Sequence, residues 1–203
     1  MEENEKSWNP LTTEEVSLLF SSAPFPVWVA GGIALELAVG QSIRENHSDM
    51  DVFLLRHDHL IVRDWLSDWE CWVADPPGSL REWPLGQELG TEMHDIWCRR
   101  TSDDDWRLQL MLDEVDISGN WVSRRDAEIY APLSEITRTT SSGVNYLAPH
   151  IQLYYKAKKP CEKDQIDFDA VMNSGITLDT NWLRNAISHS YGITHSWLKS
   201  LSE

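Results

Sequence analysis

The stretch VWVAGGIALELAVGQSIRENHSDMDVF, residues 27–53, decides the fold that we expect for this chain. An apolar strand over residues 27–30 leads into a pair of glycines, and a short apolar helix follows as far as Gly40. Gly40 suits the position just past a helix end, because glycine adopts a positive φ without steric cost. A second strand then begins at Asp49.

Asp49 and Asp51 form the candidate metal site of this unit. Side chains alternate along a strand, so two carboxylates two residues apart point to the same face. Mg²⁺ takes oxygen ligands and completes its coordination with water and substrate phosphates, so few protein carboxylates are needed. A strand-edge Asp-x-Asp pair in isolation is more often a solvated turn. Here the pair is a candidate metal site because a strand, a glycine turn and a helix precede it.

Gly31 and Gly32 are candidates for phosphate binding. Without a Cβ atom, a glycine lets backbone N–H groups approach a phosphate closely, and the helix that starts there has its positive end at the same place. The simpler alternative is a turn that needs glycine for a positive φ and has no ligand.

With these motifs in place, the chain resembles the nucleotidyltransferases of the DNA polymerase beta type. It is most similar to the branch of aminoglycoside-2''-adenylyltransferases and lincosamide nucleotidyltransferases, through GGIALE at residues 31–36 and GQSIR at residues 40–44, followed by His47. Ile33 stands where that branch has tryptophan, and Glu36 where it has aspartate. The resemblance covers roughly residues 25 to 172.

The resemblance implies a third carboxylate on a strand next to the one that carries Asp49 and Asp51. The three residues would hold metal, as two Mg²⁺ ions, and activate the acceptor. Our candidate is Asp113, which ends an apolar strand over residues 106–113 and would lie at the rim of the sheet. Glu114 and Asp116 remain alternatives. The resemblance also implies nucleotide binding by Gly31, Gly32 and Arg44.

Lys156 is the basic residue that we assign to the triphosphate. Pro149 suits the first turn of a helix, and Lys156 falls in that helix, where one cation can neutralise phosphate charge. A solvated lysine in a cluster with Lys158 and Lys159 is an equal alternative.

The predicted fold class is α+β, with a mixed or antiparallel nucleotidyltransferase sheet flanked by helices. We divide the chain into a catalytic domain over residues 1–118 and a mainly helical region over residues 119–203 that packs on it. A capping box at Thr12 and Glu15 predicts a first helix. Residues 80–91 are expected to be irregular.

Composition narrows the class of protein. The formal net charge is −16 and the three cysteines are scattered, which disfavours nucleic acid as a partner and a disulfide framework alike. No apolar run reaches the length of a membrane span, and the N-terminal residues are acidic, so we expect a cytoplasmic protein without a membrane partner. Whether the chain forms a homodimer stays open.

The predicted activity is metal-dependent transfer of a nucleoside monophosphate from a nucleoside triphosphate to a hydroxyl of a small molecule, aminoglycoside-like or lincosamide-like. Two alternatives remain: a nucleotidyltransferase-like antitoxin that acts on a partner protein, and a nucleotide-binding relic without catalysis. The sequence distinguishes neither ATP from GTP nor one acceptor from another.

Overall fold

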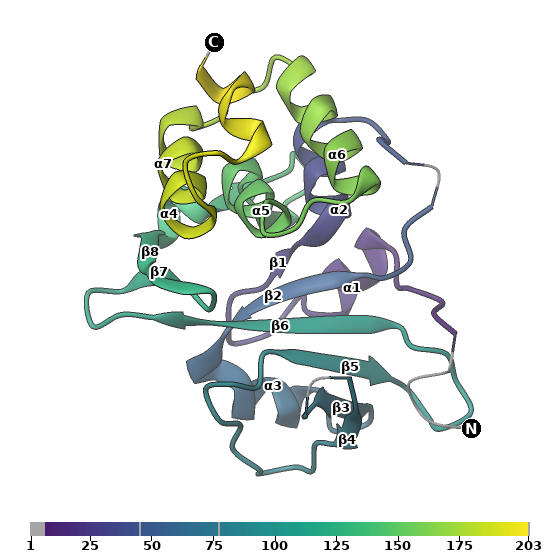
Figure 1. The fold of residues 1–203 in the computed structure, drawn as a ribbon. Coiled ribbons are helices and arrows are strands. Elements are labelled where there is room, and N and C mark those ends of the chain that lie inside the picture. Colours follow the sequence, from purple (N-terminus) through teal and green to yellow (C-terminus); the bar gives the residue numbers. More distant parts are fainter. Residues whose placement is uncertain (1–6, 45, 77, 203) are drawn as a thin grey trace.

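One mixed sheet forms the centre of the computed structural model, which describes residues 7–44, 46–76 and 78–202 (Figure 1). The strand order is β4-β3-β5-β6-β2-β1-β10-β9, and a hairpin of β7 and β8 continues from β6. The strands are β1 Trp28–Val29, β2 Asp51–Leu55, β3 Glu70–Ala74, β4 Leu80–Glu82, β5 Asp95–Arg99, β6 Leu108–Val115, β7 Asn120–Ser123, β8 Asp126–Pro132, β9 Thr137–Thr139 and β10 Asn145–Leu147.

Strand β2 lies near the middle of this sheet and carries Asp51 as its first residue. It pairs antiparallel with β1 and parallel with β6, where Asp51 is opposite Gln109 and Leu55 is opposite Asp113. Strand β1 also pairs in parallel with β10, which comes from the C-terminal half. Parallel and antiparallel pairs therefore share one sheet, and the predicted α+β class with a mixed sheet is confirmed.

Helices flank the sheet on both faces. The α-helices are α1 Thr13–Leu19, α2 Gly31–Val39, α3 His59–Trp65, α4 Leu133–Ile136, α5 Pro149–Lys156, α6 Glu162–Asn173 and α7 Thr180–Tyr191. The predicted capping box is present at the start of α1, and Gly40 ends α2 with a φ of 73°. Figure 1 shows α5, α6 and α7 gathered beyond β1, whereas α3 lies near β3 and β4. In the part of the chain that the structure describes, no helix is long and apolar enough to span a membrane.

Alternation along β2 separates two apolar clusters. Phe53 and Leu55 pack with the C-terminal helices, whereas Val52 and Leu54 pack with α1 and α3. All four side chains are buried, as expected for a central strand covered on both faces. Asp51 shares the face of Phe53, so its carboxylate lies between the sheet and the C-terminal helices.

Two segments differ from the expected structure. Residues 80–91 are not wholly irregular, because β4 pairs with β3 along one edge of the sheet. The region 119–203 begins with β7, β8, β9 and β10, so helices dominate it only from Pro149 onward. Strands β9 and β10 extend the main sheet beside β1. The division of the chain into two domains stays a prediction.

Candidate functional site

A cavity of about 420 Å³ lies where β2, β5 and β6 face α5 and the start of α6. Its carboxylates are Asp49, Asp51, Asp95 and Asp164. Its cationic side chains are Arg124, Arg125, Lys156, Lys158 and Lys159. Carboxylates and cations thus face a single space, in a chain whose formal net charge is −16. Such a lining can bind a metal ion and polyphosphate together, because phosphate oxygens contact both the metal and the cations.

Asp51 packs directly against the glycine turn. Gly31 has a φ of +66°, and a Cβ atom at this position would clash with Oδ2 of Asp51. Glycine is therefore required both by backbone conformation and by the close approach of the carboxylate. The N–H of Gly31 donates to Oε1 of Gln152 on α5 at 2.9 Å. The turn consequently positions Asp51 and α5 in addition to starting α2.

The pKa of Asp51 is raised to about 7. Burial is the largest cause, and the neighbouring charge of Asp49 adds to it, while Lys156 acts in the opposite direction. A carboxylate in this environment is costly to ionise without a compensating cation. The residues present therefore fit a divalent cation, which Asp49 and Asp51 would hold. Within the described residues, however, no group of three His, Cys, Asp or Glu side chains is arranged to hold a metal ion.

The raised pKa predicts how stability depends on pH in a chelating buffer. The folded state keeps the Asp51 proton up to about pH 7, whereas the unfolded state loses it near pH 4. The free energy of unfolding should therefore fall as pH rises through this window. Asp51→Asn removes the titration and should be more stable than the parent by about 4 kcal/mol at pH 8, from roughly three pKa units at about 1.36 kcal/mol each.

Urea denaturation in EDTA at pH 5 and pH 8 measures this difference. The stability gap between Asp51→Asn and the parent should widen at pH 8, and it should close when Mg²⁺ is added to the parent. If the two proteins differ in free energy of unfolding by the same amount at pH 5 and pH 8, ionisation of Asp51 does not destabilise the folded state.

Arg44 lies over the second glycine of the turn. A Cβ atom at Gly32 would clash with Nη2 of Arg44, which in turn contacts Nδ1 of His47 at 3.1 Å. Nε of Arg44 donates to Oδ1 of Asp167 at 3.1 Å. Neither glycine nor Arg44 lines the cavity in the described part of the chain. The structure thus places these three predicted nucleotide-binding residues behind the cavity wall.

Lys156 does line the cavity and is held by two carboxylates of α6. Its Nζ lies 3.0 Å from Oδ1 of Asp164 and 2.9 Å from Oδ2 of Asp167. Burial would lower the pKa of Lys156, but these ion pairs raise it, so the side chain stays cationic. Asp167 is fully buried and bridges Lys156 and Arg44. No local sequence pattern predicts this role of Asp167, because its partners Arg44 and Lys156 come from two distant segments.

Asp167→Asn should lower the free energy of unfolding by about 3 kcal/mol, because Arg44 and Lys156 lose the buried charge that compensates both. Asp169→Asn, on the exposed side of the same helix, is the matched control and should change little. Urea denaturation of both variants tests the difference. Equal stabilities for the two variants would contradict a structural role for the buried bridge.

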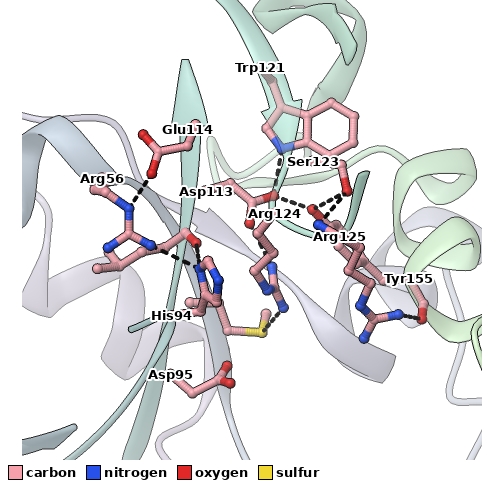
Figure 2. A network of polar contacts seen from close by, with 12 residues as sticks. Arg56, His94, Asp95, Asp113, Glu114, Trp121, Ser123, Arg124, Arg125 and Tyr155 are labelled. Carbon is pink, nitrogen blue, oxygen red and sulfur yellow. Dashed lines mark hydrogen bonds and ion pairs between the residues drawn. The ribbon is translucent and has the colours of Figure 1, made fainter. Parts of the chain in front are cut away.

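Asp113, the predicted third carboxylate, lies outside the cavity. It is fully buried and accepts hydrogen bonds from Nε1 of Trp121 at 2.6 Å, from Nη1 of Arg124 at 2.8 Å and from the hydroxyl of Tyr155 (Figure 2). Burial would lower the pKa of Arg124, but Asp113 raises it. Register explains the placement, since Asp113 is opposite Leu55 and Gln109 occupies the position beside Asp51.

The two alternatives to Asp113 are also engaged elsewhere. Glu114 is paired with Arg56 (Figure 2), and Asp116 accepts hydrogen bonds from the backbone of Ser118 and Asn120 in a turn. Asp95, the first residue of β5, is the additional carboxylate on the sheet that faces the cavity. Its charge contributes to the raised pKa of Asp51. Sequence analysis missed Asp95 because β5 is separated from β2 by β6.

Comparison with known proteins finds solved structures with a similar fold but no match in sequence. No family model matches the chain, and no curated protein matches it in sequence. The solution structure of the antibiotic-resistance factor ANT(2'')-Ia superposes with a TM-score of 0.51 and 11% identity, covering 86% of this chain and 86% of that chain. Its crystal structure in complex with adenylyl-2''-tobramycin gives the same TM-score and identity, covering 87% of this chain and 92% of that one.

The chain has a nucleotidyltransferase fold. The broader part of the resemblance seen in the sequence is thereby supported. Within this fold, Asp51 is the first residue of β2, Asp49 precedes it by two residues, and both line the cavity. The strand thus begins two residues later than the sequence predicts. At 11% identity the likeness concerns the fold, so the chemistry must be argued from the cavity itself.

Proposed function

We propose that this chain transfers a nucleoside monophosphate from a nucleoside triphosphate to a hydroxyl of a small molecule. The observation that carries the proposal is the position of Asp49 and Asp51, which face a cavity lined with five cationic side chains, in a nucleotidyltransferase fold. Two carboxylates with a raised pKa for one of them suit a divalent cation. The cations suit the phosphates that accompany it.

The proposed reaction is an in-line displacement at the α-phosphorus. The acceptor oxygen forms a bond to this phosphorus as the bond to the bridging oxygen of the β-phosphate breaks, and pyrophosphate leaves. When bound, Mg²⁺ supplies Lewis-acid stabilisation of the developing phosphate charge. The proton of the acceptor hydroxyl passes to a carboxylate. We assign this role to Asp95 in place of Asp113, because Asp95 faces the cavity and Asp113 does not.

Nucleotide binding is assigned to Lys156 and Lys159 of the cavity. Lys156 is fixed by Asp164 and Asp167, so it presents its charge in one place. Lys159 lines the same cavity and is exposed. Gly31, Gly32 and Arg44 then contribute indirectly, since the turn positions Asp51 and Arg44 braces Asp167. The ANT(2'')-Ia complex with adenylyl-2''-tobramycin supports a small hydroxyl-bearing molecule as acceptor.

The test is a transfer assay with each of the four α-labelled nucleoside triphosphates, Mg²⁺, and either a panel of hydroxyl compounds or a deproteinised bacterial extract. We expect a labelled small molecule and one equivalent of pyrophosphate. The same reaction with EDTA should give neither. Hydrolysis of the triphosphate without a labelled product, or label on protein alone, would contradict the proposal.

A second candidate function is nucleotide binding without transfer. It is favoured by Gln109, which occupies the position beside Asp51 on the neighbouring strand where a carboxylate would complete a tighter metal site. Calorimetric titration with Mg²⁺ and a nonhydrolysable triphosphate distinguishes the two functions. Tight binding with no transfer to any acceptor in the panel would favour the second candidate.

A further inference from the structure

A second cavity, of about 560 Å³, adjoins the one described above. The two share Asp95, Arg124, Arg125 and Lys158 along their common side. A molecule in the second cavity would therefore lie next to Asp95 and next to the space that we assign to the triphosphate. If the chain is a nucleotidyltransferase as proposed, this is the place for the acceptor.

Two cations of the shared wall are available to a ligand. Among the described residues, neither Arg125 nor Lys158 lies within ion-pair distance of a carboxylate. Arg125 instead donates to the backbone oxygen of Tyr155 and lies over its ring, 5.0 Å from the centroid (Figure 2). Arg124 differs, because Asp113 compensates its charge. Arg125 and Lys158 thus line the cavity without a carboxylate in direct ion-pair contact among the described residues.

The neutral groups of the second cavity add further hydrogen-bond donors. Nδ1 of His94 lies 2.9 Å from Nη2 of Arg56 (Figure 2) and 3.3 Å from the backbone oxygen of Leu112, which orients the imidazole. Burial, together with Arg124 and Arg56, lowers the pKa of His94, so the neutral form dominates at pH 7. The Tyr191 hydroxyl is buried and lies beside the side chains of Arg125 and Tyr154. Burial raises its pKa to about 12, so it remains a donor.

The second cavity contains two carboxylates, and they differ in availability. Asp126 already accepts from the hydroxyl of Ser190 at 2.6 Å and from the backbone of Glu128 at 3.1 Å. Asp95 accepts from Nε2 of Gln109 at 3.4 Å, a long contact that leaves most of its capacity free. Asp95 can therefore accept a hydroxyl proton, whereas Asp126 is already engaged and Arg125 and Lys158 supply the positive charge.

We propose that the acceptor binds in this second cavity and is a hydroxyl compound that carries an oxyanion group, a carboxylate or a phosphate. Its hydroxyl faces Asp95, and its oxyanion contacts Arg125, Lys158 and Tyr191. A polycation in this cavity would instead be repelled by Arg125 and Lys158. This inference rests on the proposed function and departs from the aminoglycoside-like acceptor that the sequence predicts.

Binding and transfer are measured separately with four probes: glucose 6-phosphate, gluconate, glucose and tobramycin. Binding is titrated calorimetrically in the presence of Mg²⁺ and a nonhydrolysable triphosphate. At least one of the two anionic probes should bind more tightly than glucose and tobramycin. Which of the two binds better distinguishes a phosphate from a carboxylate.

Arg125→Gln should weaken binding of the preferred anionic probe by about tenfold or more, because a charge-assisted contact is lost. The dissociation constant of glucose should change less than about twofold. Arg125→Lys should restore part of the affinity. Lys199→Gln, which removes the same charge from an exposed position outside both cavities, is the matched control and should behave as the parent.

Tighter binding of tobramycin than of both anionic probes would overturn the acceptor class while leaving transfer intact. Equal binding by Arg125→Gln and the parent would overturn it as well. Arg125-dependent binding of an anion with no transfer from any triphosphate would instead refute the proposed function and support the oxyanion site. The two proposals can therefore fail independently.

Discussion

Replacing Asp49 or Asp51 with asparagine is expected to lower the rate of nucleotide transfer by about 1,000-fold or more, because each change removes a carboxylate charge from the site that would hold Mg²⁺. Asparagine keeps the size of the side chain, so the fold should remain intact. The measurement is the initial rate with an α-labelled triphosphate at saturating Mg²⁺. Circular dichroism and thermal melting of each variant establish that it is folded.

Asp103→Asn is the matched control for this experiment, since Asp103 is exposed in the turn between β5 and β6. It makes the same chemical change outside the cavity and should keep the parent rate. Excess Mn²⁺ should restore part of the activity of an Asp49 variant if that residue acts through a metal. Transfer at the parent rate by either Asp49→Asn or Asp51→Asn would exclude the proposed site.

Asp113→Asn is expected to lower the free energy of unfolding by about 3–5 kcal/mol, because the buried guanidinium of Arg124 loses its compensating charge. The hydrogen bonds from Trp121 and Tyr155 end on the same carboxylate, so their geometry is disturbed as well. Urea denaturation at pH 7 measures the loss. The double variant Asp113→Asn, Arg124→Met removes both charges and should recover a large part of the stability.

These two variants, together with Asp95→Asn, decide whether Asp113 or Asp95 is the third carboxylate. If Asp113→Asn is as stable as the parent yet inactive, the role that the sequence predicts for Asp113 is correct and our assignment of Asp95 is wrong. If Asp95→Asn is stable and inactive while the double variant retains transfer, Asp95 takes that role.

Local patterns were sufficient to predict the central unit of the fold. The glycine pair, Gly40 and the apolar residues between them predict α2 and its ends, and alternation along β2 places Asp51 and Phe53 on one face. These features depend on residues close in sequence. Their physical causes are a positive φ at glycine and the two-residue period of a strand.

Register limited the prediction of the third carboxylate. Alternation correctly places Gln109, Met111 and Asp113 on one face of β6, but it does not say which of them lies beside Asp51. The structure pairs Asp51 with Gln109, which leaves Asp113 four residues further along, or about 13 Å at the usual rise of a strand. The two-residue period of the strand therefore indicated the face of Asp113 but not its distance from Asp51, and in the structure Asp113 pairs with Arg124.

Long-range pairing limited the prediction of the basic residues. Lys156 lines the cavity, and its binding to the triphosphate stays a prediction. Arg44 was expected to contact phosphate, but its partner is Asp167, which no local pattern connects with the segment before β2. Asp95 was missed for the same reason, since it reaches the cavity through the pairing of β5 with β6.

The parallel pairing of β1 with β10 has a consequence for synthesis of the chain. Val29 lies opposite Tyr146, so the strand that completes this side of the sheet leaves the ribosome long after β1 and β2. A nascent chain that ends before β10 has β1 as an exposed edge and lacks Gln152, which holds the turn at Gly31. The carboxylates of β2 should therefore reach their final arrangement late in translation, once α5 has emerged.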